Sequence, residues 1–161
     1  MTSPQDVTSP QERLDALGLK LPEVQAPVAA YVPAVRTGAY VYTAGQLPLV
    51  DGKLPATGKV GAEIGAEQAK ELARACALNA LAAAASVSGG DLAAMRQVVK
   101  VTGFVASAPD FTGQPQVVNG ASELLLEVFG DAGRHARSAV GVAALPLDAP
   151  VEVELIVEVE D

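Results

Sequence analysis

Residues 151–159 read Val-Glu-Val-Glu-Leu-Ile-Val-Glu-Val, and this stretch carries the most regular pattern in the chain. Hydrophobic residues occupy its odd positions, whereas its even positions carry three glutamates and Ile156. Because side chains alternate between the two faces of a strand, this period of two predicts a strand with one buried face and one carboxylate-rich face. Such a strand needs partner strands beside it and a second layer over its buried face.

Further strands are predicted where β-branched and aromatic residues gather between turn residues. Thr37-Gly38 joins the first two strands into a hairpin, and Asp51-Gly52 marks another tight turn. Gly103 interrupts a later strand, which indicates a bulge or a close approach of neighbouring backbone. The expected strands are Tyr31–Val35, Ala39–Thr43 with an extension at Gln46–Leu49, Gln97–Val105, and Ser138–Ala143.

Two helices are predicted between these strands. The hydrophobic period becomes about 3.6 from Ala66 to Ser86, where small apolar residues form one stripe and Gly89-Gly90 follows. A second helix begins near Pro115, buries Val117, Ala121, Leu124, Leu125 and Val128, and ends before Gly130. The resulting order, β-β-(β)-α-β-α-β-β, predicts an α+β domain with a mixed sheet.

The predicted sheet has one face that the chain itself cannot cover. Two helices suffice for one face of five or six strands, and no element remains for the other. The mean hydropathy of +0.28, with only 19% charged residues, also indicates more apolar surface than a small monomer hides. A sheet face that mixes small apolar residues with a few charges suits a subunit interface containing a pocket, so we expect a symmetric oligomer.

The 161 residues fit one domain, which we place at 29–161, after an N-terminal extension at 1–28. The extension includes a possible short helix over Gln11–Leu19. No secretory signal or membrane-spanning stretch is evident, which predicts a cytoplasmic protein without membrane association. The net charge of −8 argues against nucleic acid as a partner.

The sequence pattern alone indicates few candidate catalytic or metal-binding residues. The single histidine, His135, has no accompanying nucleophile motif and is predicted to be a surface loop residue. The single cysteine, Cys76, lies on the apolar stripe of the first helix and is predicted to be a core residue. These two residues, about sixty positions apart, supply no ligand set for a metal. Arg137 either pairs with Glu152 or Glu154 across the sheet, or holds a substrate carboxylate with its planar fork.

Several ordered motifs, running from about Tyr31 to Glu158, resemble the RidA/YjgF family. Residues 137–146 read Arg-Ser-Ala-Val-Gly-Val-Ala-Ala-Leu-Pro and are followed by Val-Glu-Val-Glu at 151–154. Upstream, residues 31–35 read Tyr-Val-Pro-Ala-Val and residues 42–48 read Tyr-Thr-Ala-Gly-Gln-Leu-Pro. Residues 101–105, Asp110-Phe111 and Val118-Asn119 match the family's middle strand and second helix.

This resemblance implies a chorismate-mutase-like fold, with two helices on one face of the sheet, that assembles as a homotrimer with clefts between subunits. It also implies hydrolytic deamination of reactive enamines and imines, such as 2-aminoacrylate, to 2-keto acids and ammonia. The ligand is then a small carboxylate-bearing metabolite, and the hydrolase needs no metal or organic cofactor. By the resemblance, Arg137 holds the substrate carboxylate and Glu152 positions water and handles protons. Tyr31, Gly45, Asn119 and Ala139 line the cleft.

Two positions depart from the family pattern. Ala44 stands where many members have serine, and Ala139 stands where many have cysteine. These changes remove a hydroxyl and a thiol, which keeps a second function open, namely a non-catalytic binder of small keto or amino acids in the same cleft. Ribonuclease activity, a label that some relatives carry, is the weakest candidate because the chain is acidic.

Overall fold

The computed structural model describes residues 9–27 and 29–160. Residues 1–8 and residue 28 of the predicted N-terminal extension, together with the last residue, lie outside this range. Over the described residues, no helix has both the length and the hydrophobicity needed to cross a membrane.

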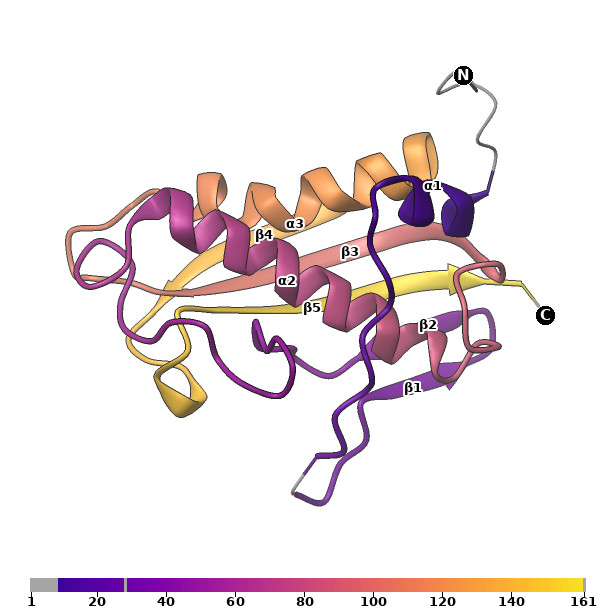
Figure 1. The fold of residues 1–161 in the computed structure, drawn as a ribbon, viewed down its shortest axis with the longest axis horizontal. Helices are drawn as coiled ribbons and strands as arrows, with labels where there is room; N and C mark the ends of the chain where they lie inside the picture. The colour runs from indigo at the N-terminus through magenta and orange to yellow at the C-terminus, as the bar shows by residue number, and fades with distance from the viewer. Residues whose placement is uncertain (1–8, 28, 161) are drawn as a thin grey trace.

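Five strands form one mixed sheet in the order β1-β2-β5-β3-β4 (Figure 1). Neighbouring strands run antiparallel except β3 and β4, which are parallel. The last strand of the chain therefore lies in the middle of the sheet, and β4 lies at one edge. The strands span Ala34–Thr37 (β1), Tyr40–Thr43 (β2), Met95–Ala106 (β3), Ala136–Val142 (β4) and Val151–Val159 (β5).

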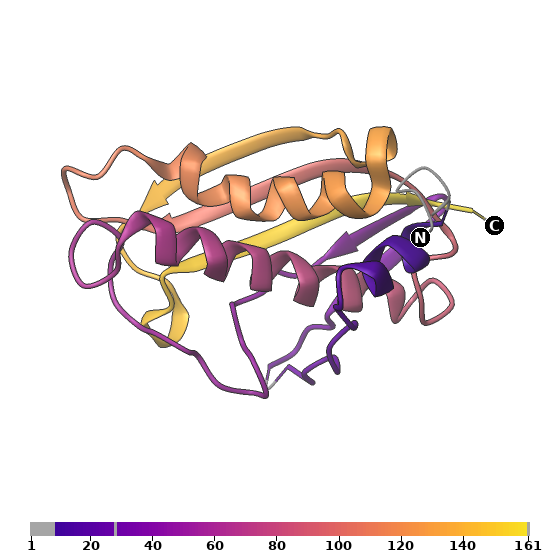
Figure 2. The ribbon, with the colours of Figure 1, turned by 45° about the horizontal axis from the view of Figure 1, so that its top comes forward.

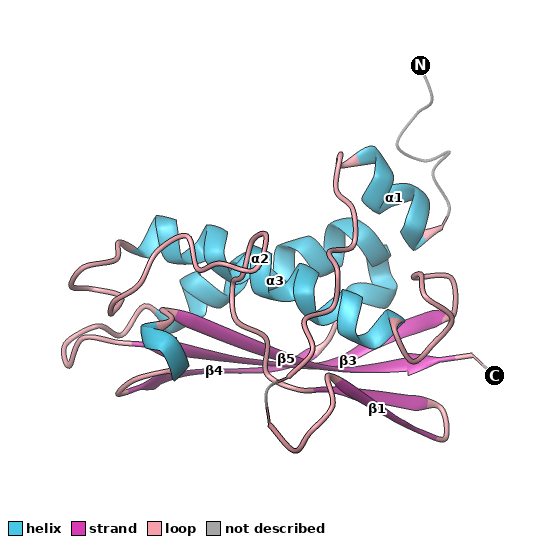
Figure 3. Ribbon diagram, turned by 60° about the horizontal axis from the view of Figure 1, so that its bottom comes forward, coloured by secondary structure: helices cyan, strands magenta, loops and turns pink. Residues whose placement is uncertain are grey.

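Two long helices, α2 (Ala66–Ala85) and α3 (Gln114–Phe129), lie side by side on one face of this sheet (Figures 1 and 2). Figure 3 shows them above the strands, with no helix on the opposite face among the described residues. The expected α+β architecture, a mixed sheet with two helices on one face, is confirmed. Short 3-10 turns, η1 (Gly130–Gly133) and η2 (Pro146–Asp148), flank β4.

The alternation in β5 decides which side chains enter the core. All five odd positions from Val151 to Val159 are buried beneath the helices, and the even positions are half-buried on the other face. The neighbouring strands follow the same pattern, because Val153 pairs with Gly103 and Gly103 pairs with Ala139. The predicted buried face of the last strand is confirmed.

A short helix, α1 (Pro10–Ala16), packs against the end of α3 (Figure 2). Ser9 and Glu12 form a reciprocal capping box at its start, which satisfies backbone N–H groups that a helix N-terminus leaves unpaired. The side chain of Leu14 is fully buried in the core. This part of the N-terminal extension therefore contributes to the main hydrophobic core.

Several strand boundaries differ from the sequence-based expectation. The first strand begins at Ala34 instead of Tyr31, because Pro33 has no N–H with which to extend the ladder. Gln46–Leu49 does not form a strand, although Gln46 makes one two-bond bridge to Val153 of β5. The edge strand begins at Ala136, two residues earlier than expected, so Arg137 lies within it.

Small residues allow the two helices and the sheet to approach closely. Gly120 of α3 lies against the backbone carbonyl of Lys70 in α2, where an added Cβ would overlap the carbonyl oxygen. Gly103 of β3 lies beneath Val118 of α3, and a Cβ there would sit 2.7 Å from Cγ1. The close approach expected at Gly103 is therefore made by a helix side chain.

We predict that Gly120→Ala lowers the free energy of unfolding by about 1–3 kcal/mol, because the added methyl group forces the helices apart. Gly65→Ser is the control, since a Cβ at Gly65 meets no atom within 4 Å and serine suits this N-cap position of α2. That control should change stability by less than about 0.5 kcal/mol. Denaturant unfolding of both variants tests this, and a Gly120→Ala variant as stable as the wild type would contradict it.

Candidate functional site

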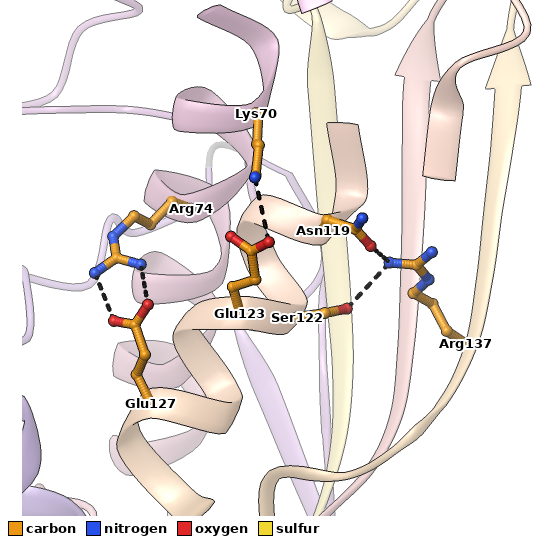
Figure 4. Close-up of polar contacts among 7 residues, drawn as sticks. All are labelled: Lys70, Arg74, Asn119, Ser122, Glu123, Glu127 and Arg137. Carbon is orange, nitrogen blue, oxygen red and sulfur yellow. Dashed lines mark hydrogen bonds and ion pairs between the residues drawn. The ribbon is translucent and has the colours of Figure 1, made fainter. Parts of the chain in front are cut away.

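Arg137 lies on the edge strand β4, on the face that the helices cover. Its Nη1 donates to Asn119 Oδ1 at 2.7 Å and to Ser122 Oγ at 3.2 Å. Asn119 and Ser122 are three residues apart on α3, so both project from the same side of the helix toward the guanidinium (Figure 4). These contacts bring two of the predicted site residues, Arg137 and Asn119, together.

The opposite edge of the guanidinium remains available. An arginine has five N–H donors, and the two on Nη1 are directed to Asn119 and Ser122. Within the described residues, no protein group accepts from Nε or Nη2 of Arg137. In Figure 4 this edge faces away from α3. The Nε–Nη2 edge is the fork that matches a carboxylate in two parallel hydrogen bonds.

Ala139 lies two residues beyond Arg137 on the same face of β4, paired with Gly103 of β3. It is half-buried and packs against the core. Its methyl group supplies neither a hydrogen-bond donor nor an acceptor.

Glu152 lies on the opposite, uncovered face of the sheet, against Gly45. A Cβ at Gly45 would sit 2.8 Å from Cδ of Glu152, so the carboxyl group occupies the space that glycine leaves open. Backbone hydrogen bonds between Gln46 and Val153, at 2.8 and 3.0 Å, hold this segment beside β5. Gly45 and Glu152, two further predicted site residues, are therefore neighbours.

The half-buried setting of Glu152 changes its acidity. Burial removes water from the carboxylate and raises the pKa of Glu152 above its usual value, and the nearby charge of Glu154 raises it further. A carboxyl with a raised pKa holds its proton closer to neutral pH, which suits a group that exchanges protons with a bound molecule.

One chain does not bring Arg137 and Glu152 together. Arg137 aligns with Val101 and Leu155 on the helix-covered face, whereas Glu152 aligns with Phe104 on the other face. The alternative interpretation, in which Arg137 pairs with Glu152 or Glu154 across the sheet, is wrong. The strand alternation places these carboxylates on the far side of the sheet.

Tyr31 lies on the loop before β1 and is 58% exposed. The uncovered sheet face also carries exposed hydrophobic side chains, which come from β1, β2 and β4: Val35, Tyr40, Tyr42 and Val140. Exposed apolar side chains gathered on one face are typical of an interaction surface.

Cys76 and His135, the single cysteine and the single histidine, lie in different environments. Cys76 is fully buried, and its Sγ contacts the carbonyl of Val151 at 3.6 Å, so the prediction of a core residue is confirmed. Burial raises the pKa of the Cys76 thiol well above its usual value. His135 lies outside helices and strands as expected, but it is half-buried and bonded to Ser122 at 2.9 Å. In the described part of the chain, no three His, Cys, Asp or Glu side chains gather to hold a metal ion.

Ser122 was not among the predicted site residues. It follows Asn119 by three residues, and this spacing places both side chains on one face of the helix. The spacing alone could not identify Ser122, because the sequence does not show that this face of α3 packs against Arg137.

We predict that Glu152→Gln stabilises the folded chain increasingly as the pH rises from about 4 through the folded-state pKa of Glu152. A carboxyl whose folded-state pKa is raised contributes stability below its unfolded pKa of about 4.3, and that contribution is lost as pH rises through the folded-state pKa. Glutamine has the same shape and no charge to desolvate. Unfolding free energies measured across this range test the prediction, and a constant difference between variant and wild type would contradict it.

Comparison with known proteins finds relatives over most of the chain. The family model for YjgF/chorismate mutase-like proteins, whose description also carries an endoribonuclease label, matches residues 11–159. Protein TCP17 of Trypanosoma cruzi is 46% identical over 149 residues, covering 92% of each chain. The 2-iminobutanoate/2-iminopropanoate deaminase of Escherichia coli is 34% identical over 131 residues, covering 81% of this chain and 88% of that protein.

Solved structures give the same result. Atu1372 of Agrobacterium tumefaciens, a protein of unknown function, has a TM-score of 0.87 and 44% identity, covering 98% of this chain and 95% of that one. TdcF of E. coli, solved with bound serine, has a TM-score of 0.60 and 26% identity, covering 86% and 94%. The family model matches nearly the whole chain, and the fold agrees with that of the solved structures. This chain therefore belongs to the YjgF/RidA family.

Proposed function

We propose that this protein hydrolyses reactive enamines and imines of the 2-aminoacrylate type to 2-keto acids and ammonia. The reaction takes place in clefts between the subunits of a cytoplasmic homotrimer. The single observation that carries the proposal is the guanidinium of Arg137, which is held on one edge by α3 and leaves its carboxylate-binding edge available.

The positions of the predicted site residues favour a site that is shared between chains. Arg137 and Asn119 lie on the covered face at the sheet edge, whereas Glu152 and Gly45 lie on the uncovered face. A single copy cannot direct both groups at one small molecule. In a closed oligomer, the Arg137 half of one subunit faces the Glu152 half of its neighbour, and Tyr31 and Ala139 line the same cleft.

The proposed chemistry needs only positioning and proton transfer. The substrate carboxylate binds Arg137, which fixes the imine carbon within reach of a water molecule beside Glu152. An enamine first gains a proton at its β-carbon and loses one from nitrogen, which gives the imine. Water then adds to the C=N bond, a proton moves to nitrogen, and the C–N bond breaks to give the keto group and ammonia. A half-buried carboxyl with a raised pKa takes a proton from the water and returns it to the leaving nitrogen.

Two relatives support a small amino-acid-like substrate. A relative 34% identical carries the deaminase name, whereas the relative that is 46% identical carries a name without an activity. The structure of TdcF, a relative 26% identical, contains serine, which has both a carboxylate and an amino group. These facts favour a small amino-acid-like ligand for the Arg137 half of the site.

A second candidate function is binding without catalysis. Ala44 and Ala139 carry neither a hydroxyl nor a thiol, so the cleft has fewer polar groups to act on a substrate. Saturable binding of 2-ketobutyrate without imine hydrolysis would favour this candidate. Ribonuclease activity remains the weakest candidate, because a net charge of −8 opposes a phosphate backbone.

We predict that Arg137→Ala reduces kcat/KM for imine hydrolysis by about 100-fold or more, because two charge-assisted hydrogen bonds to the substrate are lost. Imines generated in the assay by an amino-acid oxidase serve as substrates, and their disappearance is followed with each variant. The matched control is Arg74→Ala, because Arg74 pairs with Glu127 between the helices at 3.0 Å, away from the site (Figure 4). Equal activity of Arg137→Ala and wild type would refute the proposed function.

A further inference from the structure

A chain of hydrogen bonds connects Arg137 to a buried turn of the backbone. Arg137 Nη1 donates to Ser122 Oγ at 3.2 Å, and Ser122 Oγ lies 2.9 Å from His135 Nε2. On its other side, His135 Nδ1 lies 2.6 Å from the carbonyl oxygen of Gly133. The three side chains come from β4, from α3 and from the segment that precedes β4.

The donors and acceptors in this chain have one consistent assignment for a neutral imidazole. The Gly133 carbonyl can only accept, so His135 Nδ1 carries the hydrogen and Nε2 is an acceptor. Arg137 can only donate, so Ser122 Oγ accepts from it and its own hydrogen is directed to His135 Nε2. The hydroxyl rotor of Ser122 is thereby fixed with a lone pair toward Arg137.

The fixed hydroxyl provides the second of two anchors on one nitrogen of Arg137. A single bond to Asn119 would leave the guanidinium free to rotate about that contact. Two acceptors on Nη1, from Asn119 and Ser122, define the plane of the group and the direction of its Nε–Nη2 edge. The carbonyl at the end of this chain belongs to Gly133, which is buried against the backbone of Leu125 in α3.

We propose that Ser122 and His135 are positioning residues that hold the Arg137 guanidinium in the plane that receives the substrate carboxylate. This proposal rests on the proposed carboxylate-binding role of Arg137. Neither residue touches the substrate. Ser122 acts through Arg137, and His135 acts through Ser122.

The first test measures the affinity of the full chain for 2-ketobutyrate together with KM and kcat for imine hydrolysis. Ser122→Ala and His135→Phe should each weaken 2-ketobutyrate binding and raise KM by about 5- to 20-fold, with a smaller change in kcat. Ser122→Thr keeps the hydroxyl and should restore most of the affinity. In an Arg137→Ala background, Ser122→Ala should have no further effect, because the group that it positions is absent.

Glu123→Gln is the matched control on the same helix. Glu123 pairs with Lys70 at 3.2 Å on the side of α3 turned toward α2 (Figure 4). This exposed pair is worth little, so its loss should leave the affinity for 2-ketobutyrate unchanged. A comparable loss of affinity in Glu123→Gln and Ser122→Ala would show a general effect on α3 and overturn the proposal.

The second test determines which imidazole nitrogen of His135 carries the hydrogen, and it requires no ligand. The chain contains one histidine, so nitrogen NMR of the imidazole ring gives an unambiguous signal. In the neutral ring we expect the hydrogen on Nδ1 and none on Nε2. A neutral ring with its hydrogen on Nε2 would overturn the proposed direction of the chain.

The outcomes separate the two proposals. If Arg137→Ala weakens binding and turnover while Ser122→Ala and His135→Phe do not, the positioning proposal is wrong and the proposed function stands. If Arg137→Ala itself has no effect on either quantity, the carboxylate-binding role is wrong and the positioning proposal fails with it.

Discussion

The pairing of β5 with β2 on one side and β3 on the other fixes the face that every strand residue occupies. Because odd positions of β5 are buried under α2 and α3, the paired residues Gly103 and Ala139 must face the helices as well. The small size of Gly103 admits Val118, which seats α3 close to the sheet. Asn119 and Ser122 follow Val118 on that helix and therefore reach Arg137.

The same alternation separates the two groups to which we assign the chemistry. Arg137 shares the covered face with the buried residues, whereas Glu152 and its neighbour Gly45 share the uncovered face with exposed tyrosines. A fold that buries one face so completely has no way to turn Glu152 toward Arg137 within the same chain. In the proposed assembly, a second copy would cover the exposed apolar side chains of this face and bring its own groups to the site.

Much of the fold could be predicted from the sequence because its signals are local. Alternation in residues 151–159 and the helical stripe after Ala66 depend only on neighbouring residues, and both predicted elements are present. The face occupied by Arg137 depends on the strand order and on the parallel pairing of β3 with β4, which no local pattern encodes. The family resemblance supplied Arg137, Asn119, Gly45 and Glu152 as candidates. It did not supply Ser122 or the partners of His135, which depend on how α3 packs against the edge strand.

In the proposed assembly, each site takes Arg137 from one subunit and Glu152 from its neighbour. The most direct measurement mixes Arg137→Ala and Glu152→Gln subunits in equal amounts, by co-expression or by unfolding and refolding together, and compares imine hydrolysis with each variant alone. In a closed ring of randomly mixed subunits, half of the arginine donors and half of the glutamate donors are intact, so about a quarter of the sites recover both groups. Our account predicts that the mixture regains about that fraction of wild-type activity. If the mixture is no more active than the two variants measured separately, each chain holds its own complete site and the account is wrong.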